Sequence, residues 1–418
     1  MALAVVIFLI ALVLIATERV HRTKVALIGA ALVVIFVSEY SQELAIESID
    51  FNTIGLLAGM MILVYLTQQT GVYDYIAIRA GQISKGNPFW VVLSLAGTTA
   101  VLSAFLDNLT TILLIVPVTF LLADALDIDP IPLIVIEVIA SNIGGTATLI
   151  GDPPNIIIAG ATDLSFVDFL KNLAPIVVVT FVVTIAVLYL FYRRKLEIKP
   201  ENRRFVMELD AAGSITDRKE LNRTGTVLLL TILAFFAHQA LGIEPATVAL
   251  TGAAVALLVT TQKLEQTLSR IEWPTLFFFV GLFVMVGALV ETGALEEVAN
   301  GIQGITDGDR SAELLGILWV SGIGSGVVDN IPFTTAMIPV VEQIQTDPSD
   351  DAYWWSLALG ADFGGNMTII AAAANVAAAG LADRAGKPIG FMPFLRIGLP
   401  VTLMTLVIAT IYVALRYM

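Results

Sequence analysis

Two polar, glycine-rich stretches, similar to each other, are embedded in an otherwise apolar chain. The first contains Asp-Asn at 107–108, Asn-Ile-Gly-Gly-Thr at 142–146 and Gly-Asp-Pro-Pro-Asn at 151–155. The second contains Asp-Asn at 329–330 and Asp-Phe-Gly-Gly-Asn at 362–366. Such sequences are tolerated inside a bilayer only where they face a cavity or other protein segments. One stretch in each half of the chain is typical of the binding site of a repeat-built secondary transporter.

The composition is that of an integral membrane protein and excludes several other classes. Of the 418 residues, 57% are hydrophobic and 14% are charged, whereas a soluble domain carries roughly a quarter charged residues. The absence of cysteine excludes disulfides and thiolate ligands. The two histidines, His21 and His238, lie in different halves and indicate interfacial residues rather than a metal site, so we expect no cofactor. The net charge of -14 excludes a nucleic-acid partner by repulsion.

The two halves of the chain are copies of each other. Thr53, Gly59 and Thr70-Gly71 recur as the same residue types 222 positions later. Asp107-Asn108 recurs at the same shift, and the Gly-Gly pair of the first stretch recurs after 220 positions. Chance agreement in an apolar background would match Val, Leu and Ala rather than Asp, Asn and Gly. The chain therefore contains an internal duplication.

A hydrophilic segment separates the copies and indicates their orientation. Nine of the 22 basic residues lie between 193 and 223, which predicts a cytoplasmic segment. We therefore expect an N-terminal repeat at 1–193, a linker at 194–223 and a C-terminal repeat at 224–418. Residues 39–50 contain four acids and no Lys or Arg, whereas the equivalent 261–272 contains Lys263 and Arg270. Opposite charge bias predicts inverted copies in the plasma membrane, with both termini outside and Arg19, Arg22 and Lys24 on the cytoplasmic side.

The polar stretches also predict which segments fail to cross the membrane as simple helices. An Asp-Asn pair near the midplane is tolerated at the tip of a re-entrant hairpin, which we expect at about 88–125 and 313–345. The glycine pairs, together with Pro153-Pro154, break helices at about 131–160 and 353–381. The predicted fold is an all-α polytopic membrane protein made of two inverted repeats, with about ten transmembrane helices, two hairpins and two broken helices.

The hairpin tips and helix breaks together supply the oxygen ligands that a Na⁺-sized cation takes. The alternative is that the glycines allow close helix packing and the polar residues cap the helices. Four aspartates lie in segments without Lys, Arg or His, so each needs a cation or a proton. Glu137 is a candidate proton relay or a structural acid. The candidate ion-binding residues are Asp107, Asn108, Thr110, Ser141, Asn142, Gly144, Gly145, Thr146, Thr148, Asp152, Asn155, Asp329, Asn330, Asp362, Gly364, Gly365, Asn366, Thr368 and Asn375.

The motifs at 107–111 and 142–155 resemble those of the ArsB/NhaD permease family of the ion transporter superfamily, and its P-protein-like branch most of all. The resemblance implies two inverted repeats, a homodimer and elevator-like alternating access. Members are Na⁺/H⁺ antiporters, arsenite or antimonite effluxers, or carriers of organic anions. Related dicarboxylate symporters carry Ser-Asn-Thr at the hairpin tips, where this chain has Asp107-Asn108-Leu109 and Asp329-Asn330-Ile331. That departure argues against dicarboxylate transport.

The leading hypothesis is therefore a Na⁺/H⁺ antiporter with Asp107 and Asp329 as the exchange carboxylates. The alternative is H⁺-coupled efflux of neutral arsenite or antimonite, recognised through Asn, Thr and Asp hydrogen bonds. A Na⁺-coupled organic-anion carrier and a passive channel are further alternatives. An intramembrane aspartyl protease is disfavoured because both tip aspartates begin Asp-Asn rather than ending Gly-x-Gly-Asp, so we expect no enzyme.

Overall fold

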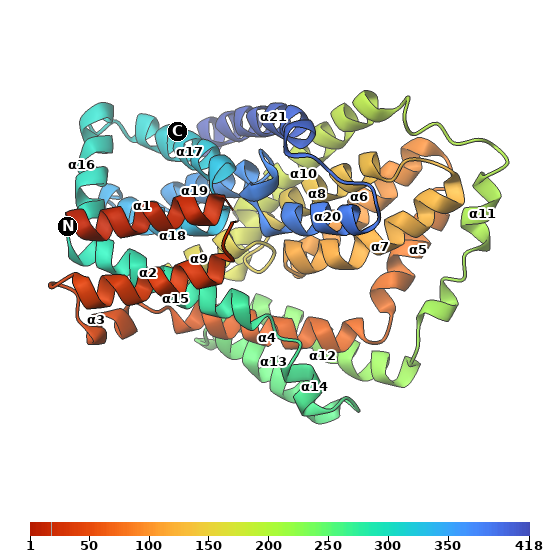
Figure 1. The fold of residues 1–418 in the computed structure, drawn as a ribbon, viewed down its shortest axis with the longest axis horizontal. Helices are drawn as coiled ribbons and strands as arrows, with labels where there is room; N and C mark the ends of the chain where they lie inside the picture. The colour runs from red at the N-terminus through yellow and green to blue at the C-terminus, as the bar shows by residue number, and fades with distance from the viewer. Residues whose placement is uncertain (18) are drawn as a thin grey trace.

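The protein is a helical bundle, which confirms the all-α fold class (Figure 1). The computed structural model describes residues 1–17 and 19–418, and this part of the chain contains helices and connecting segments without strands. The first half comprises α1 (Ala2–Ala16), α2 (Arg22–Phe36), α3 (Gln42–Glu47), α4 (Phe51–Gln68), α5 (Val72–Ile83), α6 (Pro88–Phe105), α7 (Asn108–Leu126), α8 (Ile131–Gly145), α9 (Pro153–Ala161) and α10 (Phe166–Tyr192).

The second half repeats this order of helices. After α11 (Arg203–Glu208) and the short η1 (Ala212–Ser214), each helix from α1 to α10 has a counterpart whose label is eleven higher. These are α12 (Arg218–Leu241), α13 (Pro245–Val259), α14 (Leu264–Leu268), α15 (Trp273–Glu291), α16 (Ala294–Thr306), α17 (Arg310–Val327), α18 (Asn330–Ile344), α19 (Ala352–Gly364), α20 (Ala373–Arg384) and α21 (Phe391–Tyr417), with η2 (Ile369–Ala371) before α20. Helix α12 begins inside the stretch expected to be linker.

Within the described residues, seven helices are long and apolar enough to cross a membrane: α4, α6, α7, α10, α12, α15 and α21. Three shorter apolar helices, α1, α8 and α13, have 15 residues each. A helix of that length spans about 22 Å, less than the roughly 30 Å of a bilayer's hydrocarbon core. The beginning of α2 can therefore lie at depth in the protein, which matters for the site below.

The two hairpins enter the molecule from opposite ends. Helices α6 and α7 lie on the right of Figure 1 and α17 and α18 on the left, so their tips point toward the middle. Asp107 caps α7 and Asp329 caps α18, each accepting a backbone N–H of the first turn. Helix α9 packs on α18 and α20 packs on α7, so each broken helix reaches the hairpin of the other half.

Helices from different halves also pair around the hairpins, α2 with α15 and α4 with α13. The duplicated glycines make this close approach possible. A Cβ on Gly59 would lie 2.7 Å from the carbonyl carbon of Ala249, and one on Gly281 would lie 2.6 Å from that of Ala26. Gly59 and Gly281 are therefore packing residues at two equivalent crossings.

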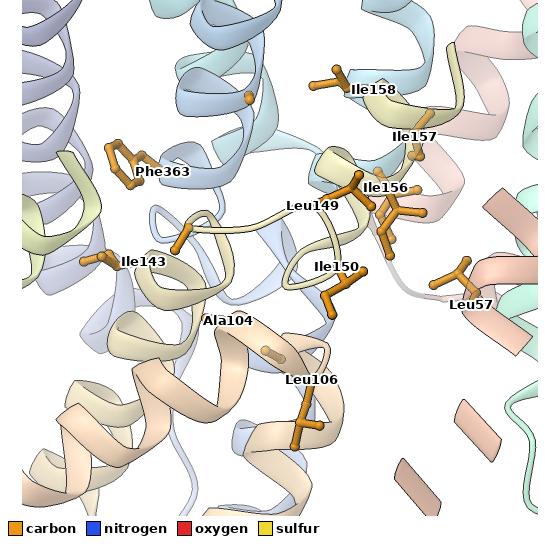
Figure 2. Packing of buried hydrophobic residues seen from close by; sticks show 14 of the residues in the cluster. Leu57, Ala104, Leu106, Ile143, Leu149, Ile150, Ile156, Ile157, Ile158 and Phe363 are labelled. Atoms are coloured by element: carbon orange, nitrogen blue, oxygen red, sulfur yellow. The ribbon is translucent and has the colours of Figure 1, made fainter. Parts of the chain in front are cut away.

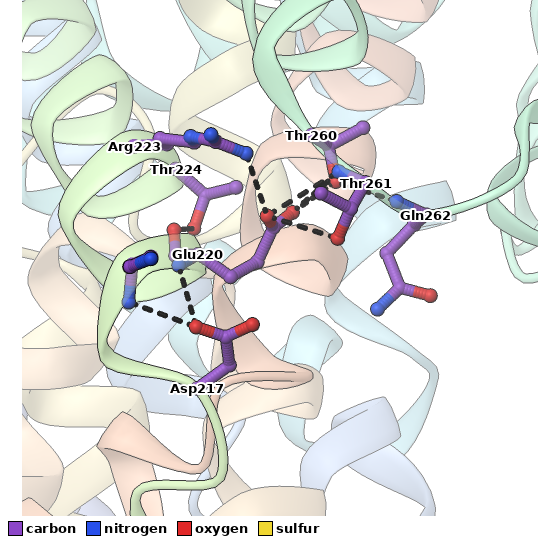
Figure 3. A network of polar contacts seen from close by, with 8 residues as sticks. Asp217, Glu220, Arg223, Thr224, Thr260, Thr261 and Gln262 are labelled. Atoms are coloured by element: carbon purple, nitrogen blue, oxygen red, sulfur yellow. Dashed lines mark hydrogen bonds and ion pairs between the residues drawn. The ribbon is translucent and has the colours of Figure 1, made fainter.

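A polar network fastens α12 to the end of α13 (Figure 3). The buried carboxylate of Glu220 accepts hydrogen bonds from the Thr261 amide at 3.0 Å and the Thr261 hydroxyl at 3.1 Å, and from the Thr260 hydroxyl. Asp217 caps the same helix by accepting from the amides of Lys219 and Glu220. Glu220 therefore has a structural role away from the duplicated motifs.

Apolar side chains anchor the segment that interrupts the first broken helix (Figure 2). Leu149 and Ile150, between α8 and α9, are buried among Ile156 and Leu106 and their neighbours. Phe363 flanks the equivalent break in the second half and is fully buried. The interrupted backbone is therefore held by packing on both sides, and its polar groups have fixed positions.

Candidate functional site

The two helix breaks meet each other directly at the centre of the protein. Helix α8 ends at Gly145 and α9 begins at Pro153, while α19 ends at Gly364 and α20 begins at Ala373. From the first break, the amide of Asn142 donates to Asn366 Oδ1 at 3.1 Å and to Asn375 Oδ1 at 3.0 Å. The duplicated stretches, which are about 220 residues apart in sequence, thus form one polar cluster.

Asp152 joins both hairpin tips to this cluster. Its carboxylate is fully buried and accepts from Asn108 Nδ2 at 2.9 Å and from Asn330 Nδ2 at 3.2 Å. Asn108 comes from the tip of the first hairpin and Asn330 from the tip of the second. A single carboxylate is therefore bonded by one amide from each repeat. The same Asn108 amide lies 3.3 Å from Asn142 Oδ1, which connects the tip to the first helix break.

Asp362 is the other fully buried carboxyl of the cluster. Neither of its oxygens accepts a hydrogen bond within the described part of the chain. The polar side chains beside it are Thr146 and Asn155, and Asn155 Oδ1 also lacks a donor there. Asp362 lies within Coulombic range of Asp152. A buried carboxylate without a donor is costly unless a cation or a proton neutralises it.

Asp107 and Asp329 are engaged differently, as helix caps. Asp107 accepts from the Thr110 amide at 2.8 Å and the Thr110 hydroxyl at 2.5 Å. Asp329 accepts from the Ile331 amide at 2.9 Å. Both carboxylates lie at the tips, but each stabilises the first turn of the following helix.

Arg22 corrects the expectation that no fixed cation reaches the site. Its Nη1 lies 3.2 Å from Asp329 Oδ2, and its guanidinium lies 5.1 Å from the ring centre of Phe278. The cytoplasmic placement of Arg22, which follows from the charge bias of the loops, stays a prediction. The contact itself arises because Arg22 is the first residue of α2 and lies against the tip of α18.

The glycine pairs support both interpretations of the sequence. A Cβ on Gly144 would lie 2.3 Å from the Ala100 carbonyl oxygen, and one on Gly364 would lie 2.4 Å from that of Gly322. These glycines let α8 and α19 pack tightly on the hairpin arms α6 and α17. Gly145 folds back toward Gly151, where a Cβ would lie 2.7 Å from the carbonyl oxygen. Gly365 is less crowded, and its carbonyl accepts from Asn375 at 2.7 Å.

The remaining candidate residues mostly hold the hairpins against the helix breaks. Ser141 donates to the Asn108 carbonyl at 3.2 Å, Thr148 to the Ala104 carbonyl and Thr368 to the Gly326 carbonyl at 2.9 Å. Asn155 and Asn375 donate to carbonyls within their own breaks. Most of these donors are used in bonds to backbone carbonyls. Sequence reasoning missed Ser103 on α6, which donates to the Ser141 carbonyl at 2.8 Å.

Glu137 lies on α8, away from the described contacts of the cluster. It is 1% exposed and accepts from the Thr119 hydroxyl at 2.6 Å, while its Oε2 has no donor within the described residues. His238 accepts from the Phe166 amide at 3.2 Å and so joins α12 to α10. Among the residues described, no three His, Asp or Glu side chains are grouped as metal ligands.

Two cavities lie at equivalent places in the repeats. One, of about 370 Å³, is lined by α4 residues including Met61 and Val64 and by Arg270 and Glu272. The other, of about 490 Å³, is lined by the α15 residues at the equivalent positions, including Phe283 and Val286. Four acidic residues, Glu47, Asp50, Glu291 and Glu342, also line the second cavity. The two cavities are thus related by the duplication but differ in charge.

Comparison with known proteins connects this architecture to membrane transport. A family model described as "Citrate transporter" matches residues 12–360. An uncharacterized transporter of Mycobacterium bovis is 46% identical over 421 residues, covering 99% of this chain and 98% of that protein. The P protein of Sus scrofa is 33% identical, over 97% of this chain and 58% of its own length. The crystal structure of the Alcanivorax borkumensis YdaH transporter, whose title notes an unusual topology, superposes with a TM-score of 0.59 at 16% identity, over 89% of this chain and 86% of that chain.

These findings bear out the P-protein relationship that we expected from the motifs. The finer assignment to the ArsB/NhaD permeases stays a prediction, because the matching family model is that of citrate transporters. The YdaH structure supports the fold alone.

Proposed function

This chain belongs to the citrate transporter family, and we propose that it is a secondary active transporter that binds a Na⁺-sized cation and a proton in turn. The observation that carries the proposal is the fully buried carboxyl of Asp362, whose two oxygens accept no hydrogen bond from the described residues. Asp152 lies within Coulombic range of it. Two fully buried carboxyls this close cannot both remain ionised without a counter-ion.

The surrounding atoms suit a small hard cation. The Asn155 side chain lies beside Asp362, its Oδ1 has no donor among the described residues, and each helix break supplies backbone carbonyls. Carboxylate, amide and carbonyl oxygens are the ligands of such cations. The exchange role, which we first expected at Asp107 and Asp329, is therefore better assigned to Asp152 and Asp362. The tip aspartates cap helices. The next residues, Asn108 and Asn330, connect the tips to Asp152 by donating hydrogen bonds to its carboxylate.

Na⁺/H⁺ exchange is tested in everted vesicles that hold a pH gradient. Adding Na⁺ should collapse the gradient saturably with the wild-type protein and leave it intact with Asp152→Asn or Asp362→Asn. Asp347→Asn is the matched control, since Asp347 lies in an exposed loop and its carboxylate bonds Ser349 alone among the described residues. Undiminished exchange in both buried-site variants would contradict the proposal. Unsaturable conductance without coupling would indicate a channel instead.

A second candidate, cation-coupled uptake of an organic anion, is favoured by the match to the citrate transporter family. The cluster itself carries several carboxyls and one nearby guanidinium, so an anion could enter only together with cations. Uptake of radiolabelled citrate under a Na⁺ or H⁺ gradient tests this candidate. Arsenite accumulation in cells with and without the gene tests H⁺-coupled efflux of arsenite or antimonite.

We further propose that the linker faces the cytoplasm and both termini face outward. The termini lie at the end of the molecule opposite α11, which belongs to the basic segment (Figure 1). The natural absence of cysteine allows single-cysteine labelling without a background. In intact cells, an impermeant maleimide should label Ser349→Cys and spare Ala212→Cys. The reverse pattern would invert the proposed orientation.

A further inference from the structure

Arg22 gives the second hairpin tip a positive charge that the first tip lacks. Its Nη1 lies 3.2 Å from Asp329 Oδ2. The equivalent Asp107 is bonded by Thr110 and has no Lys or Arg within salt-bridge distance in the described part of the chain. At 222 positions after Arg22 the sequence has Glu244. The ion pair is thus an asymmetry between repeats that are otherwise alike in this region.

The pair connects the helices around the hairpins to the ion-binding cluster. Arg22 begins α2, which is fixed to α15 through the Thr23 hydroxyl donating to the Pro274 carbonyl at 2.7 Å. Asp329 is followed by Asn330, whose amide donates to Asp152 at 3.2 Å. Arg22 therefore neutralises the carboxylate of Asp329, and the next residue, Asn330, donates a hydrogen bond to the central Asp152.

The guanidinium is partly accessible, since the Arg22 side chain is 22% exposed. It makes one hydrogen bond to Asp329 within the described contacts, although its five N–H groups can make several. It also lines a cavity of about 370 Å³, together with His21, Leu109 and Val376. A small ion in that cavity would reach Asp329 directly. Asp329 is 6% exposed, so its carboxylate needs a positive partner whenever Arg22 is absent.

We propose that Arg22 is a tethered cation that competes with the transported cation for the carboxylate of Asp329. When the tip of α18 is against α2, Arg22 occupies this carboxylate and no transported ion is needed there. When the two separate, Asp329 requires another cation. Arg22 thereby determines how many cations the protein binds in each state. This inference rests on the proposed cation-binding function of the neighbouring cluster.

The test is the amount of ²²Na⁺ bound per chain at saturation in purified protein. Arg22→Gln should bind one more Na⁺ than the wild type, because Asp329 loses its internal partner. Arg22→Gln combined with Asp329→Asn should return to the wild-type number, and Arg22→Lys, which keeps the charge, should match the wild type. A purely structural role for Arg22 would lower binding in the single variant without this return.

An unchanged number of Na⁺ ions in Arg22→Gln would overturn this inference while leaving the proposed function intact. Absence of saturable ²²Na⁺ binding in the wild type would overturn both. If Arg22→Gln does not stay folded, Arg22→Ala with methylguanidinium keeps the test decisive. Methylguanidinium should displace one Na⁺ from that variant and none from the wild type, and equal displacement from both would contradict the inference.

Discussion

Replacing Gly144 by alanine should destabilise the protein by forcing the first hairpin away from the first broken helix. The added Cβ would lie 2.3 Å from the Ala100 carbonyl oxygen and 2.5 Å from Ala100 Cα. Both atoms are backbone, so no side chain can rotate away. Overpacking of this kind costs about 1–3 kcal/mol, and the better helix propensity of alanine offsets roughly 1 kcal/mol of it. We expect a net loss of stability.

Gly97→Ala on α6 is the matched control. Apart from its own helix, no atom of the described residues lies within 4 Å of the Cβ it would add, so this variant should keep the helix-propensity gain alone. The two variants should differ in free energy of unfolding by roughly the overpacking cost, about 1–3 kcal/mol. Thermal unfolding in one detergent, followed by the fluorescence of the five tryptophans, should give the order Gly97→Ala, wild type, Gly144→Ala from most to least stable. A Gly144→Ala midpoint equal to or above that of Gly97→Ala would refute the packing argument.

Three further outcomes follow from other contacts. Glu220→Ala should lower the free energy of unfolding by about 1.5–3 kcal/mol, because it removes the hydrogen bonds that Thr260 and Thr261 donate to a charged group, yet leave the number of bound ²²Na⁺ ions unchanged; loss of Na⁺ binding would contradict its structural role. If Glu137 relays protons, Glu137→Gln should slow the release of protons on Na⁺ binding, measured with a pH-sensitive dye in a stopped-flow instrument. Thr119→Val, which removes the hydrogen-bond partner of Glu137, should leave the rate unchanged. An unchanged rate in both variants would make Glu137 a structural acid. Native mass spectrometry should give twice the 44.7 kDa of one chain if the homodimer implied by the family resemblance forms, and a monomer mass would remove that prediction.

The sequence specified the hairpins and the helix breaks because both depend on local chemistry. Asp-Asn at 107–108 caps a helix that starts at the next residue, and the structure begins α7 at Asn108 and α18 at Asn330. The glycine pairs end α8 and α19 at Gly145 and Gly364. The duplicated polar residues predicted that the two halves share one cluster, and the bonds from Asn142 to Asn366 and Asn375 join them.

Roles within the cluster could not be predicted, since they depend on which side chains meet across the fold. Asp107, Asp152, Asp329 and Asp362 look alike in sequence, but only the structure separates the caps from the carboxyls in the cluster. The contact between Arg22 and Asp329 was not predicted, because it depends on how α2 meets the tip of α18. Nothing in the sequence around Ser103 distinguishes it from other serines, so its place beside the site could not be predicted.

The central claim is that Asp152 and Asp362 form a site for a small cation. The most direct test is thermal stability of purified protein with Na⁺ or choline at equal ionic strength, because a ligand of the native state stabilises it by about 2.7 kcal/mol at one hundred times its Kd. Na⁺ should raise the unfolding temperature of the wild type and of Asp347→Asn, and should have no effect on Asp362→Asn. An equal rise in Asp362→Asn, or no Na⁺-specific rise in the wild type, would contradict the account.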